Sequence, residues 1–518
     1  MDKELLYCVV NVEGGAPKLY RLGETGVAVS NADNLNKLID TSKTWTENQF
    51  AGCVVKIIAG KGIDEKIPYR RIIANDATSL TVEPNWLIQH DNTTMYAIEG
   101  MNNWVEVMDH GMTAHVTDVR AINAYCYFCL GDSAPIRRWN LYNNAGTLTS
   151  TFADEGTTKA NFIEFVRNKE VWIATRSSVS VAAPPTSWAN MSFTSIASFN
   201  DTYGIITNLV EYDDKCFIFR EGMIYAASAY YSPATIDKAP INEMLSQKSV
   251  VNGLAAVAAN QYLYFNYGYM INRYYNTVIE NIGFLKNGGI PNEYLGIASD
   301  MVAYPGYIIA AIDGYGTSYS SIFGFNQTGW DCIYSAQNMN QRIKKIYPMM
   351  IDGKENRLYF TLNNDVRYIA MPFMNRDASF DTSYKYTHQG YIITGYIYSN
   401  LMDAIKCYRS IKLFAENVGS ASDIEVDYQI DSETEWHEVP EKFITTPMQE
   451  IDLNSMRGIT GNRIRLRIIF NTTNAAITPL LKAYVIDTIA QMNIKYSYSF
   501  NYRIVENDVN LLGELEDI

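Results

Sequence analysis

The stretch of sequence that decides the fold is Leu254-Ala255-Ala256-Val257-Ala258-Ala259-Asn260-Gln261-Tyr262-Leu263-Tyr264-Phe265. An apolar run is followed by a polar two-residue turn and then by a run rich in aromatic residues. Asn is a common turn residue and aromatic residues favour strands, so the stretch predicts a β-hairpin. The same pattern occurs five more times, at 119–128, 162–173, 206–218, 301–310 and 347–360.

These six segments are spaced regularly along the chain. One residue near the start of each second strand serves as an anchor: Cys126, Val171, Cys216, Leu263, Ile308 and Leu358. Successive anchors are 45, 45, 47, 45 and 50 residues apart. Four-stranded propeller blades repeat at about 40–50 residues. The sequence therefore predicts an all-β fold that contains a β-propeller.

The length of the repeating part predicts the number of blades. Residues 5–27 and 93–380 provide 311 positions, which is 6.9 repeats of 45. We therefore expect seven blades, with six or eight as the alternatives, in a propeller that spans 1–28 plus 93–383. Its first blade would combine N-terminal strands with residues 95–108, because joining distant parts of the chain removes the exposed edges of an open sheet.

Two further modules are expected outside the repeat. Residues 29–92 contain short strands separated by turns, which predicts a small inserted β-barrel. From 384 the 45-residue period stops, and seven strands follow, the last at 494–502. Several alternate apolar and polar residues, as Ile464-Arg465-Leu466-Arg467-Ile468 does, and this pattern is typical of a sheet with one buried face. We expect a β-sandwich at 384–504 and a C-terminal arm at 505–518.

Composition excludes several classes of protein. The chain has 56 acidic and 42 basic residues, a net charge of −14, and 13% aromatic residues. A chain so rich in aromatic residues and so poor in charge is not disordered. A general nucleic-acid binder needs a basic surface, which this composition does not supply. The most apolar stretches, 253–259 and 307–312, are far shorter than the roughly 18 residues of a membrane span, so no membrane partner is expected.

The cysteines predict thiols and no metal site. Seven cysteines, an odd number, are scattered over the chain, whereas a disulfide framework is usually even and denser. Cys126 and Cys129 have the CxxC spacing but lie in a run that reads as a strand. Residues i and i+3 of a strand point to opposite faces, so these two sulfurs could not share one metal ion.

The sequence points to no catalytic, cofactor-binding or metal-binding residue. It contains no phosphate-binding loop and no GxSxG motif. His110 and His115 flank Gly111 and are better explained as a polar strand end and a turn than as a metal pair. Asp313-Gly314-Tyr315-Gly316 predicts a hairpin turn, and Gln327-Thr328-Gly329-Trp330-Asp331 predicts a turn followed by a packed Trp. We expect no cofactor.

Two parts of the chain resemble modules of tailed-bacteriophage structural proteins. Residues 42–57 and 70–82, which include Ser42-Lys43-Thr44-Trp45 and Asn75-Asp76-Ala77-Thr78, are similar to a small module common in these proteins. The carboxyl-terminal part resembles the sandwich that follows a propeller in phage tail proteins, on the basis of 391–398, 410–417, 426–429 and 463–469.

This resemblance implies a function in the virion. A propeller protein of this kind in short-tailed phages is the tail nozzle, a ring of subunits below the adaptor. The implied protein is a non-enzymatic structural component of the tail, of nozzle or tail-tip type, assembled in the cytoplasm of the bacterial host. Its implied partners are the adaptor, tail fibre or tube subunits and further copies of itself in a homo-oligomeric ring, with transient passage of phage DNA.

Two alternatives remain open from the sequence. A propeller can carry the two carboxylates of a glycosidase in its central channel, so a glycan-binding or glycan-degrading protein at the tail tip is the main rival. A cellular scaffold propeller is the other. For an assembly protein, the Tyr-rich runs 264–269 and 274–275 are candidate docking surfaces, and the alternative is that these side chains pack between blades.

Overall fold

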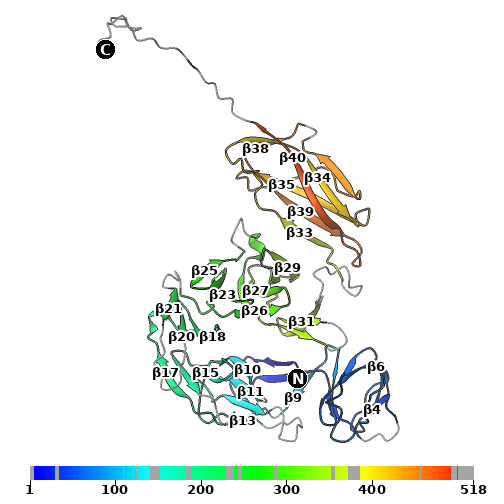
Figure 1. Ribbon diagram of the computed structural model, residues 1–518, viewed down its shortest axis with the longest axis vertical. Helices are drawn as coiled ribbons and strands as arrows, with labels where there is room; N and C mark the ends of the chain where they lie inside the picture. Colours follow the sequence, from blue (N-terminus) through cyan, green and yellow to red (C-terminus); the bar gives the residue numbers. More distant parts are fainter. Residues whose placement is uncertain are drawn as a thin grey trace, which may run out of the picture. The chain divides into compact units, whose positions relative to one another are not determined.

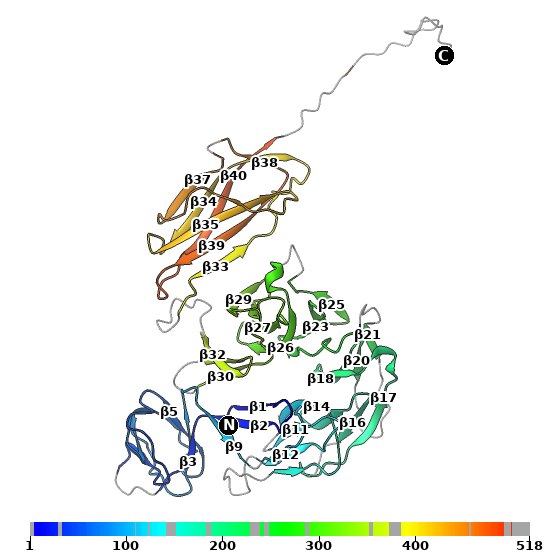
Figure 2. The same ribbon diagram turned by 180° about the vertical axis from the view of Figure 1, so that it is seen from behind.

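The computed structural model describes residues 5–29, 34–108, 110–122, 125–140, 152–182, 188–227, 239–242, 248–284, 290–351, 356–371, 385–454, 457–491 and 499 (Figures 1 and 2). The chain divides into two compact units, Met1–Phe380 and Asp381–Ile518. The described residues form β-strands, with helical geometry confined to the 3-10 turns η1 (Asp201–Tyr203) and η3 (Asn292–Tyr294). The predicted all-β class is confirmed.

Unit 1 contains, in its described residues, seven sheets of three or four antiparallel strands. Their strands are, sheet by sheet, β1 (Tyr7–Val10), β2 (Lys18–Leu22) and β9 (Trp104–Val107); β10 (Asp118–Ile122), β11 (Tyr125–Cys129), β12 (Arg137–Asn140) and β13 (Phe152–Asp154); β14 (Phe162–Val166), β15 (Glu170–Ala174), β16 (Ser178–Ala182) and β17 (Thr194–Ser198); β18 (Ile206–Tyr212), β19 (Lys215–Arg220), β20 (Met223–Ala227) and β21 (Ala239–Asn242); β22 (Ala256–Ala259), β23 (Tyr262–Tyr267), β24 (Met270–Tyr275) and β25 (Val278–Asn281); β26 (Ile297–Tyr304), β27 (Tyr307–Asp313), β28 (Ser321–Phe325) and β29 (Trp330–Ser335); and β30 (Ile346–Met350), β31 (Asn356–Leu362) and β32 (Asp365–Met371).

The six anchor residues occupy equivalent places in this arrangement. Each lies on the second strand of its sheet, and the six sheets follow one another along the chain. Five of the anchors are the second residue of that strand, and Leu358 is the third. All six are buried. The predicted repeat is confirmed, because turn signals and alternating apolar residues mark each hairpin locally.

Hydrophobic clusters join each sheet to the next. Six clusters connect the first sheet to the second and so on up to the seventh. A further cluster joins Leu22 of the first sheet to Met349 and Tyr359 of the last, so the sheets close into a ring. The first strand of each four-stranded sheet lies toward the middle of the ring, and the fourth lies at the periphery (Figure 2). Unit 1 therefore contains a β-propeller.

A six-stranded sheet makes up the inserted module. In spatial order its strands are β3 (Thr25–Val27), β8 (Met95–Glu99), β5 (Val54–Ala59), β6 (Tyr69–Asn75), β7 (Ser79–Glu83) and β4 (Lys37–Ile39). The two ends of this order meet, because the Val29 amide donates to the Ile39 carbonyl at 2.7 Å. Trp45, Phe50, Ile72 and Trp86 are buried in its core.

The predicted bounds of this module, 29–92, are wrong. β3 and β8 belong to the six-stranded sheet, so the module begins before residue 29 and ends after residue 92. The sequence predicts that the segment 95–108 completes the first sheet of the ring, but only its strand β9 joins that sheet. The chain leaves the ring at Gly23 and returns at Gly100, both with positive φ. A Cβ at Gly23 would lie 2.1 Å from the Ile98 carbonyl oxygen, so only glycine allows this close crossing.

Unit 2 has two sheets around one core. One sheet has the order β33 (Gln389–Ile393), β39 (Ile464–Thr472), β35 (Ser422–Ile430) and β36 (His437–Glu438). The other is built on β34 (Ile405–Glu416), which pairs with β37 (Met448–Asp452) and β38 (Ile459–Gly461) and, along its whole length, with β40 (Leu480–Gln491). Side chains of both sheets fill a shared core, which is the arrangement of a β-sandwich. The predicted start of this module at 384, most of the predicted strand 494–502 and the predicted arm 505–518 lie outside the described residues.

Candidate functional site

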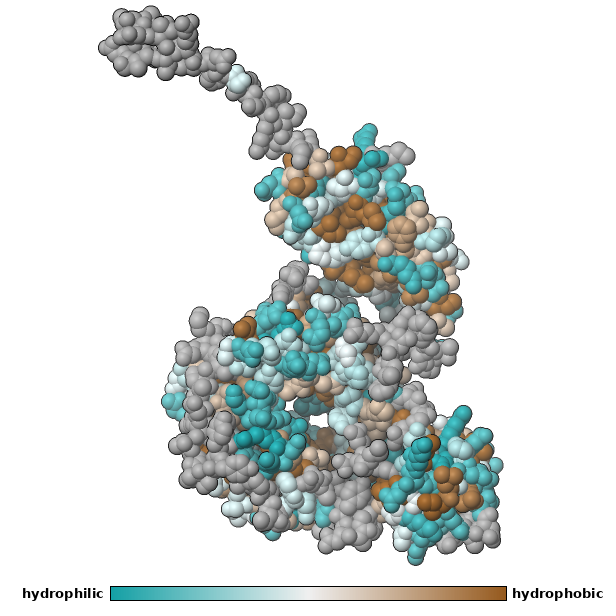
Figure 3. Space-filling model, viewed as in Figure 1, coloured by the Kyte–Doolittle hydropathy of each residue, from teal (hydrophilic) through white to brown (hydrophobic). Residues whose placement is uncertain are grey.

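Five charged side chains, from four sheets of the ring, lie on or directly before the first strand of their sheet. We call Asp118, Arg120, Glu164, Asp300 and Lys345 the axial cluster. Asp118 and Arg120 lie on β10, Glu164 on β14, Asp300 on β26, and Lys345 directly precedes β30. Figure 3 shows an opening in the middle of the ring, and the first strands of the sheets lie nearest to it (Figure 2).

Asp118 joins the second sheet to the third. Its carboxylate accepts hydrogen bonds from the Val119 amide at 2.8 Å and from the Ile163 amide of β14 at 2.9 Å. Burial raises the pKa of Asp118, although Arg120 and Lys345 act in the opposite direction. Because Lys345 belongs to the last sheet, this electrostatic influence crosses the ring.

Glu164 and Arg120 form a second link between the same two sheets. Their side chains form an ion pair, and the other carboxylate oxygen of Glu164 accepts the Phe165 amide at 2.9 Å. Only 7% of the Glu164 side chain is exposed. Burial raises the pKa of Glu164 to about 6.

Asp300 links the sixth sheet to the seventh in the same manner. One oxygen accepts the Ile346 amide of β30 at 3.1 Å, and the other lies 3.3 Å from the Lys345 ammonium. The carboxylate of Asp300 raises the pKa of Lys345. Neighbouring Ser299 donates to the Ile343 carbonyl at 2.7 Å, which adds a further bond between these sheets.

Uncharged residues make equivalent joints elsewhere in the ring. Asn11 exchanges two hydrogen bonds with the Val116 backbone, at 2.8 and 2.9 Å, between the first and second sheets. Asn208 donates to the Gly253 carbonyl at 3.0 Å, between the fourth and fifth. Asp118, Asn208 and Asp300 thus each hold backbone that lies about one repeat further along the chain.

The geometry favours a structural use of these groups over a chemical one. Both oxygens of Asp118 and of Glu164 are engaged by backbone amides or by Arg120. In the described part of the chain, no three His, Cys, Asp or Glu side chains are placed to hold a metal ion. Hydrogen bonds to charged groups are stronger than neutral ones, so the axial cluster stabilises the joints between sheets.

Replacing Glu164 with Gln should remove part of the pH dependence of stability. The pKa of Glu164 is about 6 when folded and 4.5 ordinarily, so the folded state binds its proton more tightly. The stability that this group contributes is present below pH 4.5 and is lost as the pH rises through 6, by about 2 kcal/mol. Urea unfolding at pH 4.5 and 7 should show this loss in the wild type and lack it in E164Q. The exposed Glu47→Gln is the control, and an unchanged pH dependence in E164Q would contradict the assignment.

The residues singled out from the sequence serve structural ends. The Cys126 and Cys129 side chains enter different hydrophobic clusters, on opposite faces of β11, as predicted. His110 accepts the Met112 amide at 3.1 Å, and His115 contacts the Val12 carbonyl at 3.0 Å, so the two rings are engaged separately. All seven cysteines are free thiols, and burial raises the pKa of Cys126 to about 12.

The two glycine-containing motifs form turns. Asp313 ends β27, and its carboxylate accepts the Tyr315 amide at 3.0 Å and pairs with Arg342 at 2.7 Å. Gln327 to Gly329 connect β28 to β29, after which Trp330 packs against Phe284 and Phe325. Both predicted turns are confirmed.

For most of the Tyr-rich side chains the structure supports packing between blades, the alternative that the sequence left open, over exposure as a docking surface. Tyr264, Phe265 and Tyr267 are at most 4% exposed and Tyr274 is 8% exposed, because they pack between neighbouring sheets. Tyr267 also donates its hydroxyl to the Arg220 carbonyl of the preceding sheet at 3.1 Å. Of these runs, Tyr269 and Tyr275 remain exposed.

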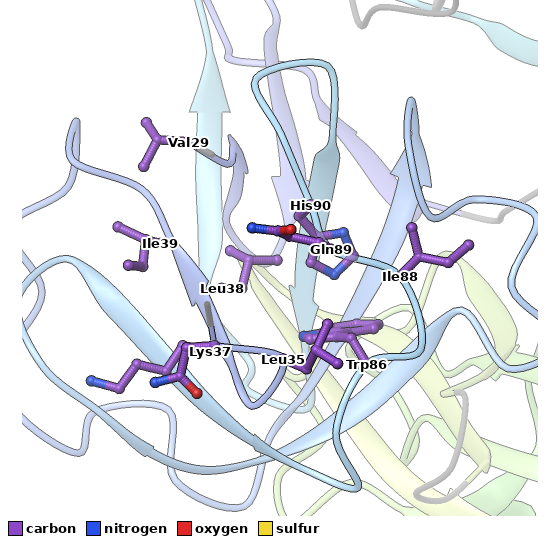
Figure 4. Close-up of a pocket in the computed structure, with 10 residues that line it drawn as sticks. Val29, Leu35, Lys37, Leu38, Ile39, Trp86, Ile88, Gln89 and His90 are labelled. Atoms are coloured by element: carbon purple, nitrogen blue, oxygen red, sulfur yellow. The ribbon is translucent and has the colours of Figure 1, made fainter. Parts of the chain in front are cut away.

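A pocket in the inserted module is too small to indicate a ligand. Figure 4 shows Trp86 and His90 beside the apolar side chains of Leu35 and Leu38. The enclosed space is about 10 Å³, which is room for no more than about one water molecule. The two rings pack edge to face at 4.6 Å, and burial lowers the pKa of His90.

Comparisons with known proteins assign neither a family nor a function to the chain. Neither a protein-family model nor a curated protein matches the chain. The chain is similar to the WD40 domain of Pan2 from Neurospora crassa, with 8% identity, coverage of 68% of this chain and 90% of that chain, and a TM-score of 0.34. It is also similar to Hsv2 from Kluyveromyces lactis, with 10% identity, coverage of 54% and 91%, and a TM-score of 0.33. These likenesses do not bear on the number of blades, and seven stays a prediction.

Sequence reasoning missed the axial cluster, although a signal was present. Asp118, Glu164 and Asn208 stand 46 and 44 residues apart, close to the period of the anchors, and Asp300 follows two periods later. A search for polar residues that recur at the repeat length would have found them.

No helix in the described residues is long and apolar enough to cross a bilayer.

Proposed function

We propose that the chain is a virion structural protein of a tailed bacteriophage, a tail component of nozzle or tail-tip type that acts through subunit interfaces. The observation that carries this proposal is the use of the axial cluster as joints between sheets. Asp118 and Asp300 each clamp the backbone of the next sheet, which favours a rigid ring over a reactive site. A rigid ring is what a load-carrying assembly component requires.

The residues behind the phage resemblance support the same proposal. Trp45 and Phe50 are buried in the inserted module, and the Trp45 indole donates to Glu24 at 2.8 Å. Asn75 is buried and accepts the Phe50 amide at 2.8 Å while donating to the Thr46 carbonyl at 2.8 Å. The residues that carry the resemblance thus stabilise the fold of the inserted module. A shared set of such residues supports a common architecture with the phage module.

Exposed apolar side chains of unit 2 support the proposal that this unit binds other proteins. Several large ones are more than a third exposed, namely Ile392, Ile405, Phe414, Met448, Val485 and Ile489. All of these except Ile392 lie on β34, β37 and β40 of one sheet, and grouped apolar exposure marks protein contacts. The proposed partners are further copies in a homo-oligomeric ring and the adaptor, fibre or tube subunits of the tail. The net charge of −14 suits transient passage of DNA, because like charge reduces adhesion.

One observation favours a glycan-degrading propeller as the second candidate. Glu164, with a pKa of about 6, has the property of a general acid, and Asp118 is close enough to raise that pKa. Glycosidases use two such carboxylates. The engagement of all four oxygens weighs against this candidate.

One experiment separates the two candidates. Virions are assembled from a phage that carries a deletion of this gene, and the purified subunit is incubated with host polysaccharides. The structural proposal expects missing or incomplete tails and no turnover. Normal tails without the protein, together with turnover that Glu164→Gln abolishes, would support the glycosidase and overturn the proposal.

A further inference from the structure

In the described part of unit 2, the outer strand of one sheet leaves a long edge unpaired. β40 has 12 residues and, in the described part of unit 2, pairs with β34 alone. The strands on the other side of β34, β37 and β38, have 5 and 3 residues. Long, unpaired edges offer backbone groups to another chain, and proteins usually shorten or protect them.

β40 carries little of the usual protection. It contains no proline, and its charged residues are Lys482 and Asp487. Each lies close to an opposite charge on β34: Lys482 is 3.2 Å from Glu416, and Asp487 is 3.7 Å from Arg409. Neither is an isolated charge of the kind that repels a further strand.

Apolar side chains are exposed along the same strand. Val485 is 48% exposed, Ile489 54% and Tyr484 38%. Phe414 and Met448, which pair across β34 and β37, extend the exposed apolar surface. Figure 3 shows hydrophobic side chains gathered on the visible face of unit 2. The edge is therefore open to both hydrogen bonds and apolar contacts.

The sequence that follows β40 has the pattern of a partner strand. Residues 494–504 read Ile-Lys-Tyr-Ser-Tyr-Ser-Phe-Asn-Tyr-Arg-Ile, with an apolar residue at every second position. Strict alternation over eleven residues is typical of a β-strand with one apolar face. Apart from Ser499, this segment lies outside the described residues.

The connection between β40 and this segment favours pairing with a different copy. A tight hairpin back onto β40 would need a turn such as Asn-Gly or Asp-Gly. Residues 490–494 read Ala-Gln-Met-Asn-Ile, and neither glycine nor proline occurs between 480 and 512. The sequence therefore favours an extended continuation of the strand over a return.

We propose that residues 494–504 of one copy add as a strand to the free edge of β40 in a second copy. Main-chain hydrogen bonds would supply affinity, and the alternate apolar side chains would supply specificity, as in other cases of strand addition. The proposal rests on the homo-oligomeric ring proposed above and names the contact that holds neighbouring subunits together.

The test uses the full chain with a matched pair of triple variants. Ile494→Asp, Tyr498→Asp and Tyr502→Asp together charge the apolar face of the segment. Ser497→Asp, Ser499→Asp and Asn501→Asp together add the same charge to the polar face. We expect the first triple variant to raise the apparent dissociation constant of the oligomer by at least about 100-fold in sedimentation, because three apolar side chains leave the interface. The second should assemble like the wild type.

Amide hydrogen exchange shows where the contact lies. It also distinguishes pairing of residues 494–504 with β40 of a second copy from pairing with β40 of the same copy. Amides of β40 should be protected in the wild-type oligomer and should lose protection on dilution, as the oligomer dissociates. Oligomers that the apolar-face variant leaves intact, or β40 protection that does not change with concentration, would overturn the proposal. Neither result would touch the tail assignment, which the deletion phage tests separately.

Discussion

Replacing Glu65 with Ala is expected to lower the free energy of unfolding of the inserted module by about 3–5 kcal/mol. Glu65 and Arg70 form a buried ion pair at 2.7 Å, with 1% and 3% of their side chains exposed. The other oxygen of Glu65 accepts the Leu87 and Ile88 amides at 3.1 and 2.8 Å. The substitution leaves a buried guanidinium without its carboxylate and two amides without their acceptor. Urea unfolding followed by amide exchange in β5 and β6 measures the effect.

The neighbouring Asp64 offers a matched control. Its side chain is exposed, so Asp64→Ala removes the same charge from the same loop and should change stability by no more than about 0.5 kcal/mol. Glu65→Gln keeps an acceptor for the two amides and should fall between the two. A loss below about 1 kcal/mol in E65A would mean that the pair contributes little to the module.

Replacing Tyr359 with Ala is expected to loosen the closure of the ring and to cost about 3–5 kcal/mol. Tyr359 is 2% exposed and packs with Leu22 and Met349 where the last sheet meets the first. It also contacts Trp104 edge to face at 6.2 Å and accepts a hydrogen bond from Arg357 at 3.3 Å. Removing the aromatic side chain of Tyr359 leaves a cavity between the last sheet and the first. These two sheets are not consecutive along the chain, so side-chain packing has to hold them together.

The location of the effect is the sharper part of this prediction. Amides of β1, β2, β30 and β31 should exchange faster in Y359A, whereas those of β15 and β19, in the third and fourth sheets, should change least. The control is Tyr269→Ala, which removes an exposed Tyr from another sheet and should leave both stability and exchange unchanged. Uniformly faster exchange across all sheets would contradict a local role for Tyr359 in closure.

Local signals in the sequence were enough to predict the repeat. Each hairpin carries its own turn residues and alternating apolar positions, so Cys126, Val171 and the other anchors could be aligned without knowledge of the tertiary structure. The turns at Asp313 and before Trp330, and the opposite directions of Cys126 and Cys129, follow from the same short-range rules. The sandwich strands were found in the same way, because alternation reports a one-sided burial.

Tertiary structure alone decided how the modules join and which side chains are available. The sequence determined an all-β chain with a propeller repeat, because strand and turn preferences act within a few residues. The boundary of the insert depends on β3 pairing with β8, whose residues are some 70 positions apart, and no local pattern encodes that pairing. Burial of Tyr264 and Tyr267 and the joints made by Asp118 and Asp300 depend on the neighbouring sheet. A strand shows which residues share a face, but the opposing surface decides whether that face meets water, core or a partner.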